Sequence, residues 1–155
     1  MAKVYRTELS PVSFLRRNAY VYPEKTAVVH GQRRYTYAEF AARVNRLAAG
    51  LRAAGLEKHE RVAFLAPNIP ALLEAHFAVP AAAAILVAIN TRLNTSEIDY
   101  ILRYCGARFL FVDRELNPLV EELDVSALQV VHIHDSGAAD DPYEKFLAAA
   151  APVPG

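Results

Sequence analysis

The sequence has 155 residues, of which 54% are hydrophobic and 22% charged, and its 17 basic and 17 acidic side chains balance at neutral pH. This composition excludes a disordered chain, and the balanced charge provides no overall field to attract nucleic acid or an anionic membrane. The chain has one cysteine, no apolar run long enough to cross a bilayer and no secretory signal at its start, so we expect a cytoplasmic protein without a transmembrane segment or a nucleic-acid partner.

The start of the chain predicts a short helix followed by a hairpin. The helix is expected over residues 11–20, with Phe14, Leu15 and Ala19 on its apolar side. Two runs rich in β-forming residues, 26–30 and 33–37, flank a turn that contains Gly31. Two such runs around a short glycine-containing turn are typical of a β-hairpin.

A long amphipathic helix is the most clearly marked element of the sequence. Thr36 and Glu39 form the T-x-x-E pattern of a capping box at its beginning, and Gly55 ends it. Apolar residues recur along it at spacings of three and four, which predicts one face in the core. Three arginines are expected on the outward face: Arg43, Arg46 and Arg52.

Four apolar runs predict buried strands in the rest of the chain: 61–66, 85–89, 108–112 and 129–133. After the first, Asn68 is expected to cap a helix that extends towards Pro80. That helix is apolar on nearly all sides, which predicts burial on most sides, with His76 as a core histidine bonded to the backbone.

Helices are predicted between the remaining strands. Asn94 and Glu97 form a second capping box, and the helix that follows ends at Gly106. A weaker helix is expected near 116–123 and a short last one over 142–149. Strands that alternate with helices at this spacing predict an α/β fold, a mostly parallel doubly wound sheet with flanking helices.

The turn after the strand at 85–89 is the candidate binding site. Asn90, Thr91 and Arg92 interrupt the apolar pattern at the predicted carboxyl end of that strand. In open α/β sheets ligands bind at this edge, and a guanidinium can hold a phosphate through two hydrogen bonds. The alternative is that Arg92 merely donates hydrogen bonds to loop carbonyls.

Other candidate groups lack the partners that a catalytic or metal site would need. The scattered glycines exclude a dinucleotide-binding fingerprint and a P-loop. His132 and His134 share a strand face but have no third metal ligand nearby, and Cys105 has no paired base. Arg33 is interpreted as part of a solvated face. Three aspartates are interpreted as a solvated turn: Asp135, Asp140 and Asp141. We therefore predict no catalytic residue and no metal site in this chain.

Residues 22–113 resemble the amino-terminal part of AMP-forming acyl-CoA synthetases. These enzymes belong to the adenylate-forming superfamily, together with luciferases and peptide-synthetase adenylation domains. The segment YTYAEF at 35–40 matches the first conserved motif of the family, and RVAFLAPN at 61–68 and AINTRL at 88–93 match later ones in the family's order. In these motifs the sequence is most similar to members that activate medium- or long-chain fatty acids and related carboxylates.

The resemblance implies a two-step reaction. ATP and a carboxylate give an acyl-adenylate, and the CoA thiol then displaces AMP to give acyl-CoA. Family members use a phosphate loop, an acidic residue that binds Mg²⁺, a ribose-binding aspartate and a lysine on a mobile carboxyl-terminal domain. None of these motifs occurs in the 155 residues. We therefore expect this piece alone to be inactive and to bind none of ATP, CoA and Mg²⁺ tightly.

The resemblance leads to an expectation for each of two residues. The arginine of the N-x-R-L turn, here Arg92, lies in the CoA-ligase branch where it can approach a phosphate of the CoA nucleotide. Ala83 stands where relatives often have glycine, and an alanine there would be strained if the backbone needs a positive φ.

The resemblance also suggests a domain organisation. The chain reads as an incomplete amino-terminal domain, with a helix and hairpin at 11–37, a βαβ core at 37–134 and a tail at 135–155. Its expected partners are a fatty acid or related carboxylate and the remainder of the ligase chain, with association through exposed apolar surface. The alternative is a stand-alone α/β module that binds a nucleotide or another protein without ligase activity.

Overall fold

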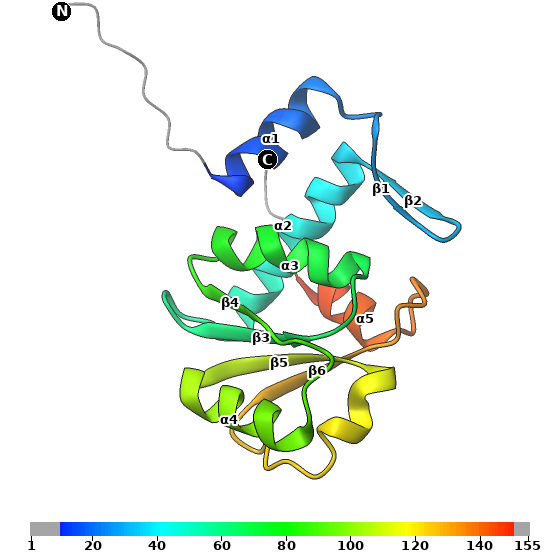
Figure 1. Cartoon of the computed structure of the whole chain (residues 1–155). Helices are drawn as coiled ribbons and strands as arrows, with labels where there is room; N and C mark the ends of the chain where they lie inside the picture. The colour runs from blue at the N-terminus through cyan, green and yellow to red at the C-terminus, as the bar shows by residue number, and fades with distance from the viewer. Residues whose placement is uncertain (1–9, 151–155) are drawn as a thin grey trace, which may run out of the picture.

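A parallel sheet forms the centre of the computed structural model, which describes residues 10–150 (Figure 1). Its four strands lie in the order β4-β3-β5-β6, and every neighbouring pair is parallel. The strands span Arg61–Leu65 (β3), Ile85–Ala88 (β4), Ala107–Asp113 (β5) and Gln129–Ile133 (β6). The prediction of a mostly parallel α/β sheet with flanking helices is confirmed.

Three helices cover one face of the sheet: α2 (Tyr37–Ala53), α3 (Pro70–Ala81) and α5 (Pro142–Ala149). Side chains from β3 and β5 meet them there. Phe64 stacks on Phe111 with ring centroids 4.4 Å apart, and Tyr143 of α5 meets Phe111 edge-on. Aromatic pairs of this kind add to the free energy of apolar burial, so this face holds the larger core.

The opposite face is covered by α4 (Thr95–Cys105) and a short 3₁₀ helix, η1 (Arg114–Leu119) (Figure 1). The capping box of Asn94 and Glu97 is present, and Gly106 ends α4 in the left-handed conformation at φ 58°, as predicted. The weak helix expected near 116–123 is wrong in type and position. η1 begins at Arg114 and contains Pro118, which has no N–H to donate to an α-helical ladder.

The first helix and the hairpin lie outside this sheet. α1 spans Pro11–Val21, and β1 (Thr26–His30) pairs with β2 (Arg33–Thr36) in a separate antiparallel sheet, as expected. Of the three residues predicted on the apolar side of α1, Leu15 is buried as expected, whereas the side chain of Phe14 is 53% exposed. The main contacts of α1 are with α2 and α3.

One expectation about the apolar elements is wrong. β4 was expected to be covered on both faces, yet it is an edge strand, and the side chain of Ile85 is 50% exposed. α3 is buried on most sides, as expected, with Leu73 41% exposed and Glu74 fully buried. An apolar sequence pattern shows that side chains favour burial. It does not show whether other parts of the described chain are present to cover them. No helix within residues 10–150 has the length and hydropathy needed to cross a membrane.

The turn between α3 and β4 is strained at one residue. Ala83 adopts φ 61°, in the left-handed region where a Cβ is unfavourable. This is the condition under which the alanine was expected to strain the backbone. The amide of Ala83 is held by Pro80 and its carbonyl accepts from the amide of His59, so the turn is fixed by hydrogen bonds at both sides of the residue.

Candidate functional site

A hollow of about 460 Å³ lies where β3 and β4 end. We call it the carboxyl-edge hollow. Its walls come from the turn after β3, the turn after β4 and one side of α3, and they include Asn68, His76, Asn90 and Thr91. The carboxyl edge of a parallel sheet is where α/β proteins bind ligands, and the hollow adjoins the turn predicted as the binding site.

Arg92 follows directly on this hollow. The turn is shaped by Asn90, whose side-chain oxygen accepts the backbone N–H of Arg92 at 3.0 Å and whose carbonyl accepts the N–H of Leu93 at 3.3 Å. The Arg92 side chain is exposed. Among the ion pairs and side-chain hydrogen bonds of residues 10–150, none uses its guanidinium. The arrangement therefore leaves an exposed cation in the turn beside the hollow, which suits a phosphate on the surface.

A second, more polar hollow of about 250 Å³ lies at the carboxyl ends of β3, β5 and β6. It is lined by Asp113, Arg114, Glu115 and His134, among others. Asp113 is only 5% exposed because its carboxylate begins η1, accepting the N–H of Glu115 at 2.9 Å. Within the described residues no group of three histidine, cysteine or acidic side chains is placed to hold a metal ion.

The principal cluster of buried charge lies elsewhere, between α2, α3 and α5. Arg43 was expected to point outward, but it is 9% exposed. Its Nε donates to Glu74 at 2.5 Å, and its Nη2 donates to Glu144 at 2.6 Å. The hydroxyl of Tyr143 donates to the other Glu74 oxygen at 2.6 Å. The prediction failed because both carboxylates come from distant parts of the chain.

Burial decides the electrostatics of this cluster. Loss of water raises the pKa of the Glu74 carboxyl above its ordinary value, although the charge and hydrogen bonds of Arg43 act in the opposite direction. Burial raises the pKa of Tyr143 well above its usual range, and the neighbouring Glu74 adds to this effect. For Arg43 burial favours the neutral form, but Glu144 and Glu74 together raise its pKa and keep it protonated. The cluster is therefore a structural one, closed to substrate.

A signal in the sequence could have revealed this cluster. Glu74 is the only acidic residue in the apolar segment that forms α3, which contains neither lysine nor arginine. A carboxylate in a helix with no polar face must find a buried donor, because an isolated buried charge is very costly. That requirement points to an arginine on a neighbouring helix.

The remaining candidate side chains have ordinary partners. His76 was expected in the core, but it is exposed and its Nδ1 donates to the Leu72 carbonyl at 2.8 Å. His132 Nδ1 is hydrogen-bonded to the side-chain oxygen of Asn117 at 3.0 Å. Cys105 makes a weak contact with the carbonyl of Leu102 at 3.5 Å.

Two polar positions next to turns also differ from expectation. Asn68 does not cap α3, because Ile69 is the capping residue and provides no side-chain bond. Arg33 is not simply solvated, since its guanidinium binds Asp135 at 2.5 Å. Asp141 begins α5 by accepting the N–H of Tyr143 at 3.0 Å. The three aspartates predicted as a solvated turn therefore have different roles. Asp141 caps α5, Asp135 is an ion-pair partner, and Asp140 is exposed.

Known proteins are similar to this chain in sequence and in fold. The family described as AMP-binding enzyme matches residues 15–153. A peroxisomal butyrate–CoA ligase of Arabidopsis thaliana is 43% identical over 115 residues, which is 74% of this chain and 20% of the relative. A peroxisomal benzoate–CoA ligase of the same plant is 43% identical over 114 residues, again 74% and 20% of the two chains.

Solved structures give the same result. The anthranilate CoA ligase AuaEII, in complex with anthranoyl-AMP, superposes with a TM-score of 0.83 at 28% identity over 92% of this chain and 28% of that one. A long-chain-fatty-acid CoA ligase described as putative, from Rhodopseudomonas palustris, gives a TM-score of 0.82 at 28% identity over 94% and 37%. The chain spans about a fifth of the length of the curated relatives it matches.

Proposed function

Because this chain belongs to the AMP-binding enzyme family, we propose that it is the amino-terminal part of an acyl-CoA ligase. The ligase would join a carboxylate to AMP from ATP and then transfer the acyl group to the thiol of CoA. The observation that carries the proposal is 43% identity to two CoA ligases over 74% of the chain. The remainder of the ligase chain is then the main partner of this part.

We assign to Arg92 the binding of a phosphate of the CoA nucleotide. Three features support this role: its position at the carboxyl edge of the sheet, its exposure, and a guanidinium that takes part in none of the ion pairs of residues 10–150. A guanidinium binds phosphate through two parallel hydrogen bonds, which lysine cannot do. Arg92 would bind and orient CoA and take no part in bond formation.

The chemistry of adenylation is assigned to the rest of the ligase. ATP supplies the AMP that activates the carboxylate, and Mg²⁺ would offset charge on its phosphates. No residue between 10 and 150 is assigned to that step. The isolated chain should therefore form no acyl-AMP, which trapping with hydroxylamine would detect as hydroxamate. Hydroxamate formed by the pure chain would contradict this proposal.

Two classes of carboxylate are candidates for the substrate. The sequence resemblance favours a medium- or long-chain fatty acid, and a structural neighbour is described as a long-chain-fatty-acid CoA ligase. The names of the curated relatives favour butyrate, benzoate or acetate instead. Comparison of kcat/KM for butyrate, benzoate and palmitate in a ligase that contains this segment would decide between the two.

The role of Arg92 is tested in the same ligase. Replacement by alanine should raise KM for CoA about tenfold while leaving adenylate formation unchanged, because one charge-assisted contact is worth roughly 1.5 kcal/mol. Arg108, exposed at the start of β5 on the opposite edge of the sheet, provides the matched control. Equal loss in both half-reactions, or an equal effect of Arg108→Ala, would overturn the assignment.

The size of the native protein tests whether this part works within a longer chain. An antibody against the helix from Thr36 to Ala54 would detect it in its source cells. A band several times heavier than 17.1 kDa supports the ligase proposal, and a band at 17.1 kDa favours a stand-alone binding module. The same cells would test the predicted cytoplasmic location against the peroxisomal one that the names of several relatives carry.

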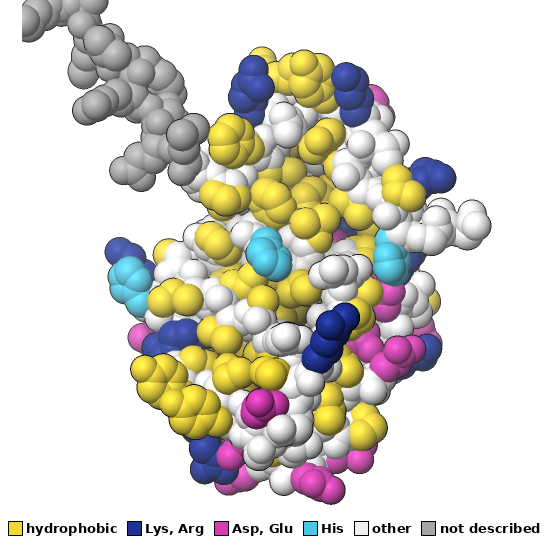
Figure 2. All heavy atoms as spheres, viewed as in Figure 1, with side chains coloured by type: hydrophobic (Ala, Val, Ile, Leu, Met, Phe, Trp, Pro, Cys, Tyr) yellow, Lys and Arg dark blue, Asp and Glu magenta, His cyan; other side chains and the backbone are white. Residues whose placement is uncertain are grey.

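Apolar surface around α1, α3 and β4 gives the proposed remainder of the chain a place to pack (Figure 2). The exposed large apolar side chains include Phe14, Val29, Leu73 and Ile85. Contiguous exposed apolar area is a usual mark of an interaction surface. We expect the isolated chain to associate through this surface.

A further inference from the structure

The outer edge of β4 carries backbone groups without partners. On the inner edge, the N–H groups of Ile85 and Ile89 donate to carbonyls of the neighbouring β3 segment at 2.9 and 2.8 Å. Because consecutive residues of a strand direct their backbone groups to opposite sides, the N–H and C=O of Leu86 and Ala88 point away from β3. Among the backbone hydrogen bonds of residues 10–150, none uses these groups. The main sheet is therefore open along this side of β4.

The side chains of β4 are apolar on both faces of the sheet. Leu86 packs against the larger core, Val87 packs against the smaller core on the opposite face, and each is only partly buried. At the start of the strand, the side chain of Ile85 is 50% exposed. Apolar residues on both faces are typical of parallel strands that have neighbours on both sides. The side chains of β4 thus fit an interior strand, although the described chain places it at an edge.

Apart from its length of four residues, β4 has none of the features that protect edge strands. Its sequence, ILVA, contains no charged residue and no proline, and its register with β3 has no bulge. Native proteins usually place such features on an open edge, because the edge is a template for pairing with another strand. The edge of β4 is therefore suited to extension of the sheet.

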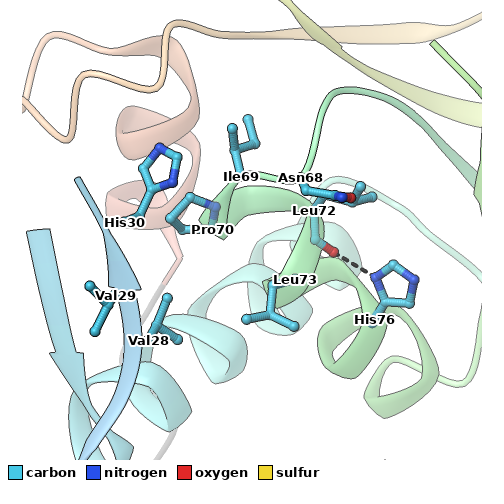
Figure 3. Close-up of a pocket in the computed structure, with 9 residues that line it drawn as sticks. All are labelled: Val28, Val29, His30, Asn68, Ile69, Pro70, Leu72, Leu73 and His76. Carbon is cyan, nitrogen blue, oxygen red and sulfur yellow. Dashed lines mark hydrogen bonds between the residues drawn. The ribbon is translucent and has the colours of Figure 1, made fainter. Parts of the chain in front are cut away.

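Another apolar depression of the described chain is bounded on both sides. A hollow of about 280 Å³ lies between β1 and α3, where Val28 and Val29 line it from the hairpin and Leu72 and Leu73 line it from the helix (Figure 3). At β4, in contrast, apolar side chains adjoin the open backbone of the main sheet, and no described strand pairs with it on that side. The surface at β4 therefore fits a strand better than a small ligand.

We propose that β4 pairs with a further β-strand from the remainder of the ligase, which bonds to the backbone of Leu86 and Ala88. This inference rests on the proposed function, because it needs the longer chain of which the described part spans about a fifth in the curated relatives. A second copy is a poorer occupant. Four residues form a strip only about 13 Å long, whereas separate chains that form stable complexes bury about 1,200–2,000 Å². A strand of the same chain has a high effective concentration and needs less contact.

Amide hydrogen exchange tests the pairing, with Val87 as the internal control. The N–H of Val87 points to β3 and should be protected both in the 155-residue protein and in a ligase that contains it. The N–H groups of Leu86 and Ala88 should exchange rapidly in the 155-residue protein, kept dilute enough to be monomeric, and at least about tenfold more slowly in the ligase.

Two results would overturn the proposal. Rapid exchange of Leu86 and Ala88 in both proteins would mean that no strand pairs there. Slow exchange in both would mean that this chain or a second copy already covers the edge. Neither readout depends on the formation of acyl-CoA, so a failure of strand pairing is distinguished from a failure of the proposed ligase activity.

A matched pair of proline substitutions tests the outward backbone groups. Ala88→Pro removes an N–H that bonds to no backbone group of residues 10–150, and an edge strand tolerates proline where the N–H faces solvent. It should leave the midpoint of thermal unfolding of the isolated chain within about 2 °C and lower that of the ligase by about 5 °C or more. Val87→Pro removes a bond to β3 and should lower both midpoints. Equal shifts of the two proteins with Ala88→Pro would refute the pairing.

Discussion

Two arginines mark two contrasting regions of the molecule. Arg43 lies between α2, α3 and α5. Its Nε donates to Glu74, and its Nη1 and Nη2 donate to Glu144. Arg92 lies in an exposed turn beyond β4, where only its backbone N–H is bonded. The first region is fixed by contacts from three helices, and the second by one asparagine. The same residue type stabilises the fold in one place and is available for a ligand in the other.

The difference shows what each region is suited to do. A buried pair leaves an uncompensated charge when one partner is lost, so the α2–α3–α5 region tolerates little change. An exposed arginine in a turn costs the fold almost nothing to alter. Variation of function is therefore expected near β4, where the exposed edge and its turns lie, while the helical face remains constant.

The largest expected effect follows from breaking the buried cluster. Arg43→Ala should lower the free energy of unfolding by about 3–5 kcal/mol, because Glu74 keeps no cationic partner in a site closed to water. Arg46→Ala, an exposed neighbour on the same helix, should stay within about 0.5 kcal/mol of the wild type. Urea denaturation measures both. Similar losses in the two variants would remove the contrast between buried and exposed arginines.

A second test follows the proton on Glu74. Its folded pKa lies above its ordinary value of 4.5, so above pH 4.5 the unfolded chain loses a proton that the folded chain still holds. The contribution of Glu74 to stability should therefore fall as pH rises through the window that begins at 4.5 and ends at the raised pKa. Glu74→Gln cannot titrate and lacks this fall. Urea denaturation at several pH values should show wild type losing stability relative to Glu74→Gln as pH rises, and a gain would show that Arg43 outweighs burial.

A smaller effect of opposite sign is expected at the turn before β4. Ala83→Gly should raise the free energy of unfolding by about 1 kcal/mol, because glycine adopts φ 61° without the Cβ clash. Ala81→Gly, two residues earlier at the carboxyl end of α3, should not raise it and should lower it by at most about 0.5 kcal/mol. Thermal or urea unfolding of the pair distinguishes strain at Ala83 from a general effect of glycine in this segment.

The smallest effect should be that of Arg92→Ala on folding. With its side chain in none of the ion pairs of residues 10–150, the change should alter the free energy of unfolding by less than about 0.5 kcal/mol. A loss of 2 kcal/mol or more would mean that Arg92 supports the turn and would weaken its assignment to CoA. Urea denaturation of this variant beside Arg43→Ala gives the comparison directly.

Local chemistry predicted much of this fold. Thr36 with Glu39 and Asn94 with Glu97 mark helix starts within four residues, and Gly106 marks an end, so these boundaries can be recognised without tertiary information. The strand-and-helix alternation gave the parallel sheet. The position of Arg92 followed from the rule that ligands meet strand ends, but its role needs a ligand to test it.

The failures share a different cause. Arg43 has its partners 31 and 101 positions away, and Arg33 has Asp135 at 102. No helical or strand period carries information about such distances. The edge position of β4 was missed because apolar residues suit a central strand equally well, and only the sheet order distinguishes the two.

The contact between Tyr143 and Glu74 also has a consequence for how the chain is made. The tyrosine follows the glutamate by 69 positions, so at 5–20 residues per second a ribosome delivers it roughly 3 to 14 seconds later. During that interval α2 and α3 can meet, but Glu74 has neither its hydroxyl donor nor α5 to exclude water. The buried cluster on the helical face is therefore complete only when α5, which supplies Tyr143 and Glu144, has left the ribosome.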